Sequence, residues 1–397
     1  MIKLERSNFL DYLRSIAIIA VIGAHTAQTI GAIQRQAGSD IDGWLLSFFN
    51  QGAYGVQVFF FLSGYLLAML YGFSRSDVRN KTTKSFWIKR LFRIFPLWLV
   101  FFLFTVARPT LFPNSPGEWS RASDLVVVSD GLTPFLLVLL SLTFSMWLVP
   151  SVWGGFIPGG WSIQAEMLHY GFFALVRKWR VEAILGAWLF LAIPLVVVDK
   201  ILSRVDVDMG LVEGWRSQNV ASTLVFFLAG CIAHLLKEKS RRESLSAGGR
   251  FLGLIAIGTL FLVPLNNVKS GQMLPALGFI AYAVALAYVL SKLNIFSGWM
   301  LSVAKYSYFS YFFHFLVLDI LEELFRHAVN EPIPGGQIGV GAAVLVSIGL
   351  VTFVSTSVGS ISWRLLESPF ISLSQKISRN LDGDSVVKAK RASKPEA

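Results

Sequence analysis

Ionisable side chains stand inside a long apolar stretch close to the N-terminus. Asp11 and Arg14 lie three residues apart, and His25 follows Arg14 by eleven residues. At about 100° per residue, eleven steps end within about 20° of three full turns, so Arg14 and His25 share one helix face about 16 Å apart. Asp11 lies one turn before Arg14 and can pair with it. An imidazole aligned with a cation suits general-base chemistry on a substrate that carries an anionic group.

Each of these residues also has a purely structural interpretation. Arg14 can be an anchor that snorkels to the membrane surface. His25 can pack between helices with a hydrogen bond to a neighbour. Because ionisable groups inside apolar segments are costly and suggest function, the shared face favours a joint role for the two residues.

Two arginines begin a later apolar segment. Arg90 and Arg93 are one helical turn apart on the same face, shortly before Pro96. Two guanidinium groups placed in this way can clamp a phosphate bidentately, which lysine cannot do. The alternative is ordinary anchoring by basic residues at the cytoplasmic membrane surface.

A glutamate lies inside another apolar segment. Trp161 and Ser162 indicate a helix start, with Ser162 as the cap, and Glu166 and His169 follow one turn apart. A carboxylate in this position needs a partner, which can be a proton, an arginine or His169. A buried structural pair is the alternative interpretation.

Two further groups have a polar face. Ser307, Tyr311 and His314 fall on one side of a predicted helix, where they can line a substrate channel or form a hydrogen-bonded helix interface. Ser63 and Gly64 interrupt an aromatic run, and such small residues allow the close approach of a ligand or of another helix.

The composition shows which elements must hold these side chains. Of 397 residues, 54% are hydrophobic and only 15% are charged, and the mean hydropathy is +0.60. A soluble domain carries about 25% charged residues, so the sequence predicts an all-α polytopic membrane bundle. The net charge of +11 comes from basic clusters between apolar segments. That pattern follows the positive-inside rule, so we expect a lipid bilayer and no nucleic acid as partner.

About eleven apolar segments recur along the chain. The basic loops at 75–90 and 177–180 should both be cytoplasmic, so an even number of crossings should lie between them. Three apolar segments lie there, so one of them is expected to be re-entrant or interfacial. We therefore expect about ten full spans, and the segment with Arg90, Arg93 and Pro96 is one candidate for the incomplete crossing. The segments cover residues 9–30, 44–71, 86–107, 132–149, 161–176, 181–198, 217–236, 251–267, 273–291, 303–326 and 336–366.

The chain divides into a membrane domain, residues 1–372, and a basic cytoplasmic tail, residues 373–397, which we expect to be disordered because it is polar and lacks apolar periodicity. Both termini should be cytoplasmic. Cys231 is the single cysteine, so no internal disulfide is expected. The sequence has no P-loop, no zinc-type His or Cys pair and no Gly-x-Ser-x-Gly motif, and its five histidines lie far apart, so we expect no metal.

Short motifs follow one another in order along nearly the whole chain. Together they resemble the acyltransferase type 3 family of multispanning membrane O-acyltransferases. Each motif alone is weak, and their ordered coincidence is specific. The motifs are Leu10-Asp11-Tyr12-Leu13-Arg14-Ser15-Ile16-Ala17, His25, Gly55 to Tyr65, Arg90-x-x-Arg93 with Pro96, Trp161-Ser162-x-x-x-Glu166, Ser307 to Phe315, and Glu367-Ser368-Pro369-Phe370.

The resemblance implies about ten helices, a cytoplasmic acyl-CoA donor that is usually acetyl-CoA, and an acceptor hydroxyl on a carbohydrate or glycolipid. It points to a bacterial inner membrane and to polysaccharides such as exopolysaccharide or lipopolysaccharide. This chain departs from the family pattern at Gln57, where many members have an acidic residue, and at Ser368, where Lys is commoner. Neither departure touches the expected chemistry.

The residue pattern and the resemblance lead to one expected mechanism. Arg14, Arg90 and Arg93 hold the phosphates of acyl-CoA near the cytoplasm. His25 is the general base for the acceptor hydroxyl or the acyl relay, and Glu166 orients His25 or the acceptor. Asp11, Ser63, Trp161, Ser162, Tyr311 and His314 are expected to bind substrate or support the site. The rival is a proton-coupled transporter or flippase without chemistry, which should show an inverted repeat that this sequence lacks.

Overall fold

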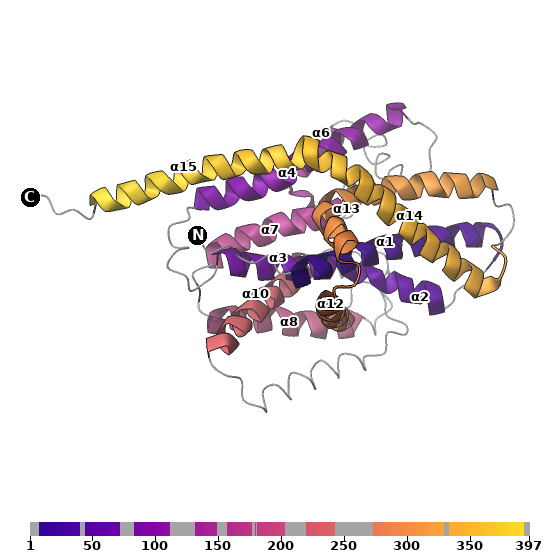
Figure 1. The fold of residues 1–397 in the computed structure, drawn as a ribbon, viewed down its shortest axis with the longest axis horizontal. Coiled ribbons are helices and arrows are strands. Elements are labelled where there is room, and N and C mark those ends of the chain that lie inside the picture. The colour runs from indigo at the N-terminus through magenta and orange to yellow at the C-terminus, as the bar shows by residue number, and fades with distance from the viewer. Residues whose placement is uncertain are drawn as a thin grey trace, which may run out of the picture.

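The computed structural model describes residues 8–39, 44–71, 83–111, 132–148, 157–176, 179, 181–202, 220–242, 273–328 and 333–392. Helices make up this described chain, with no strand, and many of them lie alongside one another in a bundle (Figure 1). The predicted polytopic helical bundle is confirmed. Six described stretches are long and apolar enough to cross a membrane, namely Asn8–Gln36, Leu46–Tyr71, Thr83–Arg108, Val220–Glu238, Pro275–Leu293 and Gly336–Asp382. The apolar segment predicted at 251–267 lies outside the described residues.

Helix α1 (Asn8–Gln36) lies at the centre of the bundle. It packs on α3 (Gly55–Tyr71), α12 (Met273–Leu293), α13 (Ser297–Ala328) and α14 (Gly336–Ser362). Its side chains are buried on several sides, which explains why the first apolar segment is hydrophobic almost all round.

Hydrogen bonds fix the first turns of α1 against the start of α13. The Ser15 hydroxyl donates to the Met300 carbonyl at 2.5 Å, and the Tyr12 hydroxyl donates to the Ile295 carbonyl at 2.8 Å. Both acceptors belong to the turn and first helical residues around the start of α13. The contacts therefore set the position of α13, which carries Tyr311 and His314, relative to Arg14 on α1.

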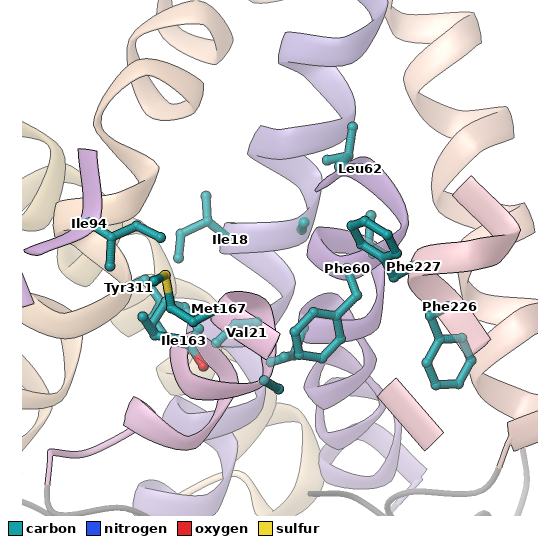
Figure 2. Packing of buried hydrophobic residues seen from close by; sticks show 14 of the residues in the cluster. Ile18, Val21, Phe60, Leu62, Ile94, Ile163, Met167, Phe226, Phe227 and Tyr311 are labelled. Carbon is teal, nitrogen blue, oxygen red and sulfur yellow. The ribbon is translucent and has the colours of Figure 1, made fainter. Parts of the chain in front are cut away.

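The hydrophobic core is continuous between these helices. Figure 2 shows part of it, with Phe226 and Phe227 of α10 (Val220–Arg242) on one side of the view and Ile94, Ile163 and Met167 on the other. All five side chains are buried. This packing holds the helices in fixed register.

Two glycines allow α3 and α10 to cross with their backbones in contact. A Cβ atom at Gly64 would overlap the Phe227 carbonyl, and a Cβ atom at Gly230 would overlap the Phe61 carbonyl. The Cys231 thiol donates to the Gly64 carbonyl at 3.4 Å across the same crossing. Close helix packing is thus the role of Gly64, and it leaves the adjacent Ser63 on another face of α3.

The segment with both arginines forms one continuous helix, α4 (Thr83–Leu111), of 29 residues. Its residues 83–108 are long enough to cross a membrane, so this segment is not an incomplete crossing by length. Of the three segments between the basic loops, 132–149 forms the shortest helix, α6 (Leu132–Leu142), followed by the short turn η3 (Met146–Leu148). Eleven residues span only about 16 Å, roughly half of a bilayer core.

Of the tail predicted to be disordered, residues 373–392 are helical and residues 393–397 lie outside the described residues. After α14, a π-helical turn, η5 (Trp363–Glu367), leads into α15 (Ser368–Ala392), which runs along α4 and beyond the bundle (Figure 1). The Ser85 hydroxyl of α4 donates to the Asp382 carboxylate at 3.0 Å. Buried Ser374 and Ser378 are small enough to let the two helices approach. The polar composition of this segment had indicated a solvated chain, but α15 packs against α4.

Candidate active site

A cavity of about 480 Å³ opens between five helices: α1, α3, α4, α13 and α7 (Gly160–Val176). Its apolar wall comes mainly from α3, with Phe59, Leu62, Leu66 and Met69 among the lining residues. The lining of α3 runs from Val56 to Leu70, which corresponds to about 21 Å of helix. The cavity is therefore elongated along α3.

The three predicted arginines line this one cavity. The Arg14 guanidinium lies 3.5 Å from the Asp11 carboxylate, which confirms the predicted pairing, and Asp11 also lines the cavity. The Arg90 guanidinium lies 5.3 Å from the centroid of the Tyr170 ring, and it also contacts the rings of Tyr71 and Phe86 at 5.8 Å each. This aromatic cage orients Arg90 while leaving its hydrogen-bond donors for an anion.

Arg93 is the most exposed arginine of the group and lies one turn further along α4. With Arg14 and Arg90 it contributes a third guanidinium group to the cavity lining. Such a set of guanidinium groups can bind phosphates, because each planar fork offers parallel N–H donors.

Glu166 projects from α7 into the same cavity. The Ser63 hydroxyl of α3 donates to Glu166 Oε1 at 2.6 Å, and the Tyr170 hydroxyl donates to the same oxygen. His169 does not pair with Glu166. Its Nε2 lies 3.0 Å from the Thr223 hydroxyl of α10, and its ring packs against Phe60. The two side chains therefore face different neighbouring helices despite lying one turn apart.

A tight turn lies beside two residues of the cavity wall, Ser162 and Tyr311. Gly159, at the turn before α7, has φ of 71°, which favours glycine, and its carbonyl accepts hydrogen bonds from the Ser162 hydroxyl at 3.0 Å and the Tyr311 hydroxyl at 3.2 Å. Ser162 also donates to Tyr311 at 2.8 Å. Ser162 therefore lies within the first turn of α7 and joins it to α13, rather than capping the helix as the sequence suggested.

His25 does not line the cavity. Its half-buried ring packs against Phe315 at 4.6 Å and His314 at 5.4 Å, measured between centroids. The His314 ring in turn lies 6.2 Å from the Tyr311 ring, which lines the cavity. Ring contacts thus link His25 to the cavity wall through His314 and Tyr311.

The predicted residues divide into two groups by position. Trp161 also lies outside the cavity lining, half-buried with its ring 6.2 Å from that of Phe60. The outer group is therefore His25, His314 and Trp161. The structure brings the others together around the cavity: Asp11, Arg14, Ser63, Arg90, Arg93, Ser162, Glu166 and Tyr311.

Two tyrosines of the cavity were not predicted. Tyr170 binds Glu166 and stacks under Arg90, and Tyr308 lines the cavity while its hydroxyl donates to the Ile94 carbonyl at 3.1 Å. Tyr170 lies four residues after Glu166, so the helical spacing was a usable signal for their contact. The cage around Arg90 involves three segments and had no local signal.

Comparison with protein families matches residues 7–354 to a family described as an acyltransferase domain. The chain belongs to this acyltransferase family. The match covers nearly the whole membrane bundle, so the predicted resemblance to the acyltransferase type 3 family is confirmed. The protein is therefore an acyltransferase, and its several apolar helices make it a multi-pass membrane protein.

Two curated relatives support the family assignment. Acyltransferase MdmB of Streptomyces mycarofaciens is 28% identical over 392 residues, which cover 94% of this chain and 93% of the relative. Exopolysaccharide production protein ExoZ of Rhizobium meliloti is 26% identical over 337 residues, which cover 81% and 90%. No solved structure matches this acyltransferase significantly. Within the described ranges, no group of three or more His, Cys, Asp or Glu side chains is arranged to hold a metal ion.

Proposed function

We propose that this acyltransferase moves an acyl group, acetyl in the simplest case, from cytoplasmic acyl-CoA to a hydroxyl of a cell-surface or exported carbohydrate or glycolipid. One observation carries the proposal: a single elongated cavity combines three arginines with a hydrogen-bonded glutamate and an apolar wall. This combination matches the parts of acyl-CoA, which has phosphates at one end, a long pantetheine arm and a thioester at the other end.

The arginines account for binding of the donor. Arg14, Arg90 and Arg93 form charge-assisted hydrogen bonds to the CoA phosphates. The pantetheine arm follows α3 past Leu66 and Leu62, which line the cavity. The thioester then comes to the region of Glu166, which contacts Ser63 midway along the α3 lining of the cavity.

His25 is the general base in this proposal. It is half-buried, whereas His314 behind it is fully buried, so the His25 ring keeps surface for a second substrate. An acceptor hydroxyl reaches His25 from the side away from the arginines, and Tyr311 marks the boundary between donor and acceptor. General-base assistance of this kind contributes about 10²- to 10⁴-fold to a rate.

Glu166 orients the reacting groups in the cavity. Its Oε1 accepts from both Ser63 and Tyr170, which fixes the carboxylate in one rotamer. Ser162 and Tyr311, joined to each other and to the Gly159 carbonyl, hold α7 and α13 in register beside it. The carboxylate is thus preorganised between α3 and α7.

The carbohydrate acceptor is supported by the name of one relative, an exopolysaccharide production protein. Both relatives come from bacteria, and with the apolar helices this supports a site in the bacterial inner membrane. We place the arginine end of the cavity and both termini in the cytoplasm, since acyl-CoA is found there. Exopolysaccharide or lipopolysaccharide sugars are then the acceptors to try first.

Titration of CoA tests the donor site directly. Detergent-purified wild-type protein should bind CoA, and Arg14→Ala should weaken the binding. Lys84, an exposed residue on α4 outside the cavity lining, gives a matched control, because Lys84→Ala removes a positive charge without touching the cavity. A wild-type protein that binds no acyl-CoA would refute the proposed donor and favour a carrier that ignores it.

A further inference from the structure

Ser63 is placed as a nucleophile rather than as a packing residue. Its Oγ donates to Glu166 Oε1 at 2.6 Å, and the Tyr170 hydroxyl holds that same carboxylate oxygen. A hydroxyl that contacts a base, with the base fixed by a third group, is the arrangement found in covalent catalysis. The three residues come from two helices, α3 and α7, whose positions are fixed by packing.

The neighbouring serines of the cavity lack this arrangement. Ser162 donates to Tyr311 and to the Gly159 carbonyl, and Ser307 donates to the Ala304 carbonyl within its own helix. Among the three serines that line the cavity, Ser63 is the one whose hydroxyl donates to a carboxylate. It is half-buried and so reachable from the cavity.

The position of His25 makes a carrier useful. The Tyr311 ring, which lines the cavity in which the donor binds, lies 6.2 Å from the ring of His314, the neighbour of His25, and 6.2 Å from that of Phe59, one turn before Ser63 on α3. Tyr311 therefore lies close to both the His25–His314 pair and the turn of α3 that carries Ser63. A direct transfer needs donor and acceptor at one point together, whereas a carrier lets CoA leave before the acceptor arrives.

We propose that Ser63 carries the acyl group as a covalent serine ester, with Glu166 as its base; this rests on the proposed use of acyl-CoA. Ser63 Oγ attacks the thioester carbonyl, the new C–O bond forms and the C–S bond breaks. CoA leaves as the thiolate, and the serine proton passes to Glu166. The products are acyl-Ser63 and a protonated Glu166.

The second step returns the enzyme to its first state. The acceptor hydroxyl attacks the serine ester and gives its proton to His25. As the C–O bond to Ser63 breaks, Ser63 takes back the proton that Glu166 held. His25 releases its proton to solvent, so one thioester and one hydroxyl give one ester, one CoA thiolate and one proton.

Labelling with radioactive acetyl-CoA in the absence of acceptor tests this carrier. Purified wild type and His25→Ala should each release CoA and gain one acetyl group, and peptide mapping should find it on Ser63. His25→Ala should keep the label when acceptor is added, because its second step is blocked. Ser302→Ala, which removes a hydroxyl that donates to the Gly298 carbonyl outside the cavity lining, should still be labelled on Ser63.

Two Ser63 variants complete the test. Ser63→Ala should bind acetyl-CoA as the wild type does and gain no label. Ser63→Cys keeps a nucleophile, and its label should become a thioester that neutral hydroxylamine removes, unlike the serine ester. Acyl transfer at the wild-type rate by Ser63→Ala overturns the carrier, as does label on another residue. CoA release without label, even in His25→Ala, overturns it while leaving the proposed function intact. A wild type that neither binds nor consumes acetyl-CoA refutes both.

Discussion

The rings of His25 and His314 lie 5.4 Å apart, tilted by 38°, where α1 meets α13. Phe315 packs against both rings, at 4.6 Å and 4.1 Å. His314 Nδ1 lies 3.0 Å from the Ser310 carbonyl, and because a carbonyl only accepts, Nδ1 carries the proton. The imidazole that the sequence predicts on the Arg14 face of α1 therefore packs against His314 and Phe315 of α13.

Removing the charge of Glu166 should slow acyl transfer strongly without weakening the binding of CoA. Glu166→Gln keeps the shape of the side chain and loses the base, so the acyl-transfer rate should fall by about 10²- to 10⁴-fold. The affinity for CoA should stay within a factor of about two, because the arginines are unchanged. Steady-state kinetics and CoA titration measure the two effects separately. Glu323→Gln on α13, outside the cavity lining, should keep the wild-type rate.

Arg90 should not be replaceable by lysine. Arg90→Lys loses the planar fork and its contact with the rings of Tyr71, Phe86 and Tyr170. We expect the dissociation constant for CoA to rise about tenfold, which corresponds to ~1.4 kcal/mol. Calorimetric titration of CoA measures the change. Equal affinity of Arg90→Lys and wild type would show that Arg90 does not contact the phosphates.

The turn at Gly159 should tolerate no side chain. Its φ of 71° costs about 1 to 2 kcal/mol for other residues, and a Cβ atom there would lie 3.1 Å from Tyr311 and Phe315. Gly159→Ala should therefore lower the midpoint of thermal unfolding in detergent and weaken acyl transfer. Gly186→Ala on α8 (Val181–Leu202) is the matched control, since no atom lies within 4 Å of its Cβ. Replacing an exposed helical glycine by alanine stabilises the folded state by up to about 1 kcal/mol.

Helix α15 should stabilise the helix that carries both arginines. Ser378 is fully buried against α4, where its hydroxyl donates to the Ser85 carbonyl at 3.4 Å. Ser378→Leu should overpack this contact, at a cost of about 1 to 3 kcal/mol in unfolding free energy. Ser372→Leu, on the exposed side of the same helix, should change it by less than about 0.5 kcal/mol. Equal thermal midpoints for the two variants would contradict the packing of α15 on α4.

Local spacing predicted the contacts that lie within one helix or one cavity wall. The pairing of Asp11 with Arg14 follows from three residues on a helix, and it is present. The expected gathering of Arg14, Arg90 and Arg93 is also present, because all three line the same cavity. Ser63 and Gly64 were expected to allow the close approach of a ligand or of another helix. Ser63 lines the cavity, and Gly64 allows the close crossing of α3 and α10.

The sequence did not predict which side chains of neighbouring helices contact each other. The spacing of Glu166 and His169 made them a plausible pair. Instead, Glu166 accepts a hydrogen bond from Ser63 of α3. His169 lies beside the Thr223 hydroxyl of α10. Arg14 and His25 share a helical face, but His25 packs against His314 and Phe315 of α13 and does not line the cavity. The tail looked disordered because its partner, α4, lies almost 300 residues away in sequence.

The role of His25 is tested by measuring acetyl-CoA turnover by purified wild type and His25→Ala, with CoA binding titrated on the same samples. With a carbohydrate acceptor present, the wild type should transfer acetyl, and His25→Ala should transfer it at least about 10²-fold more slowly while binding CoA equally well. Transfer by His25→Ala at the wild-type rate would show that the acceptor is activated without His25.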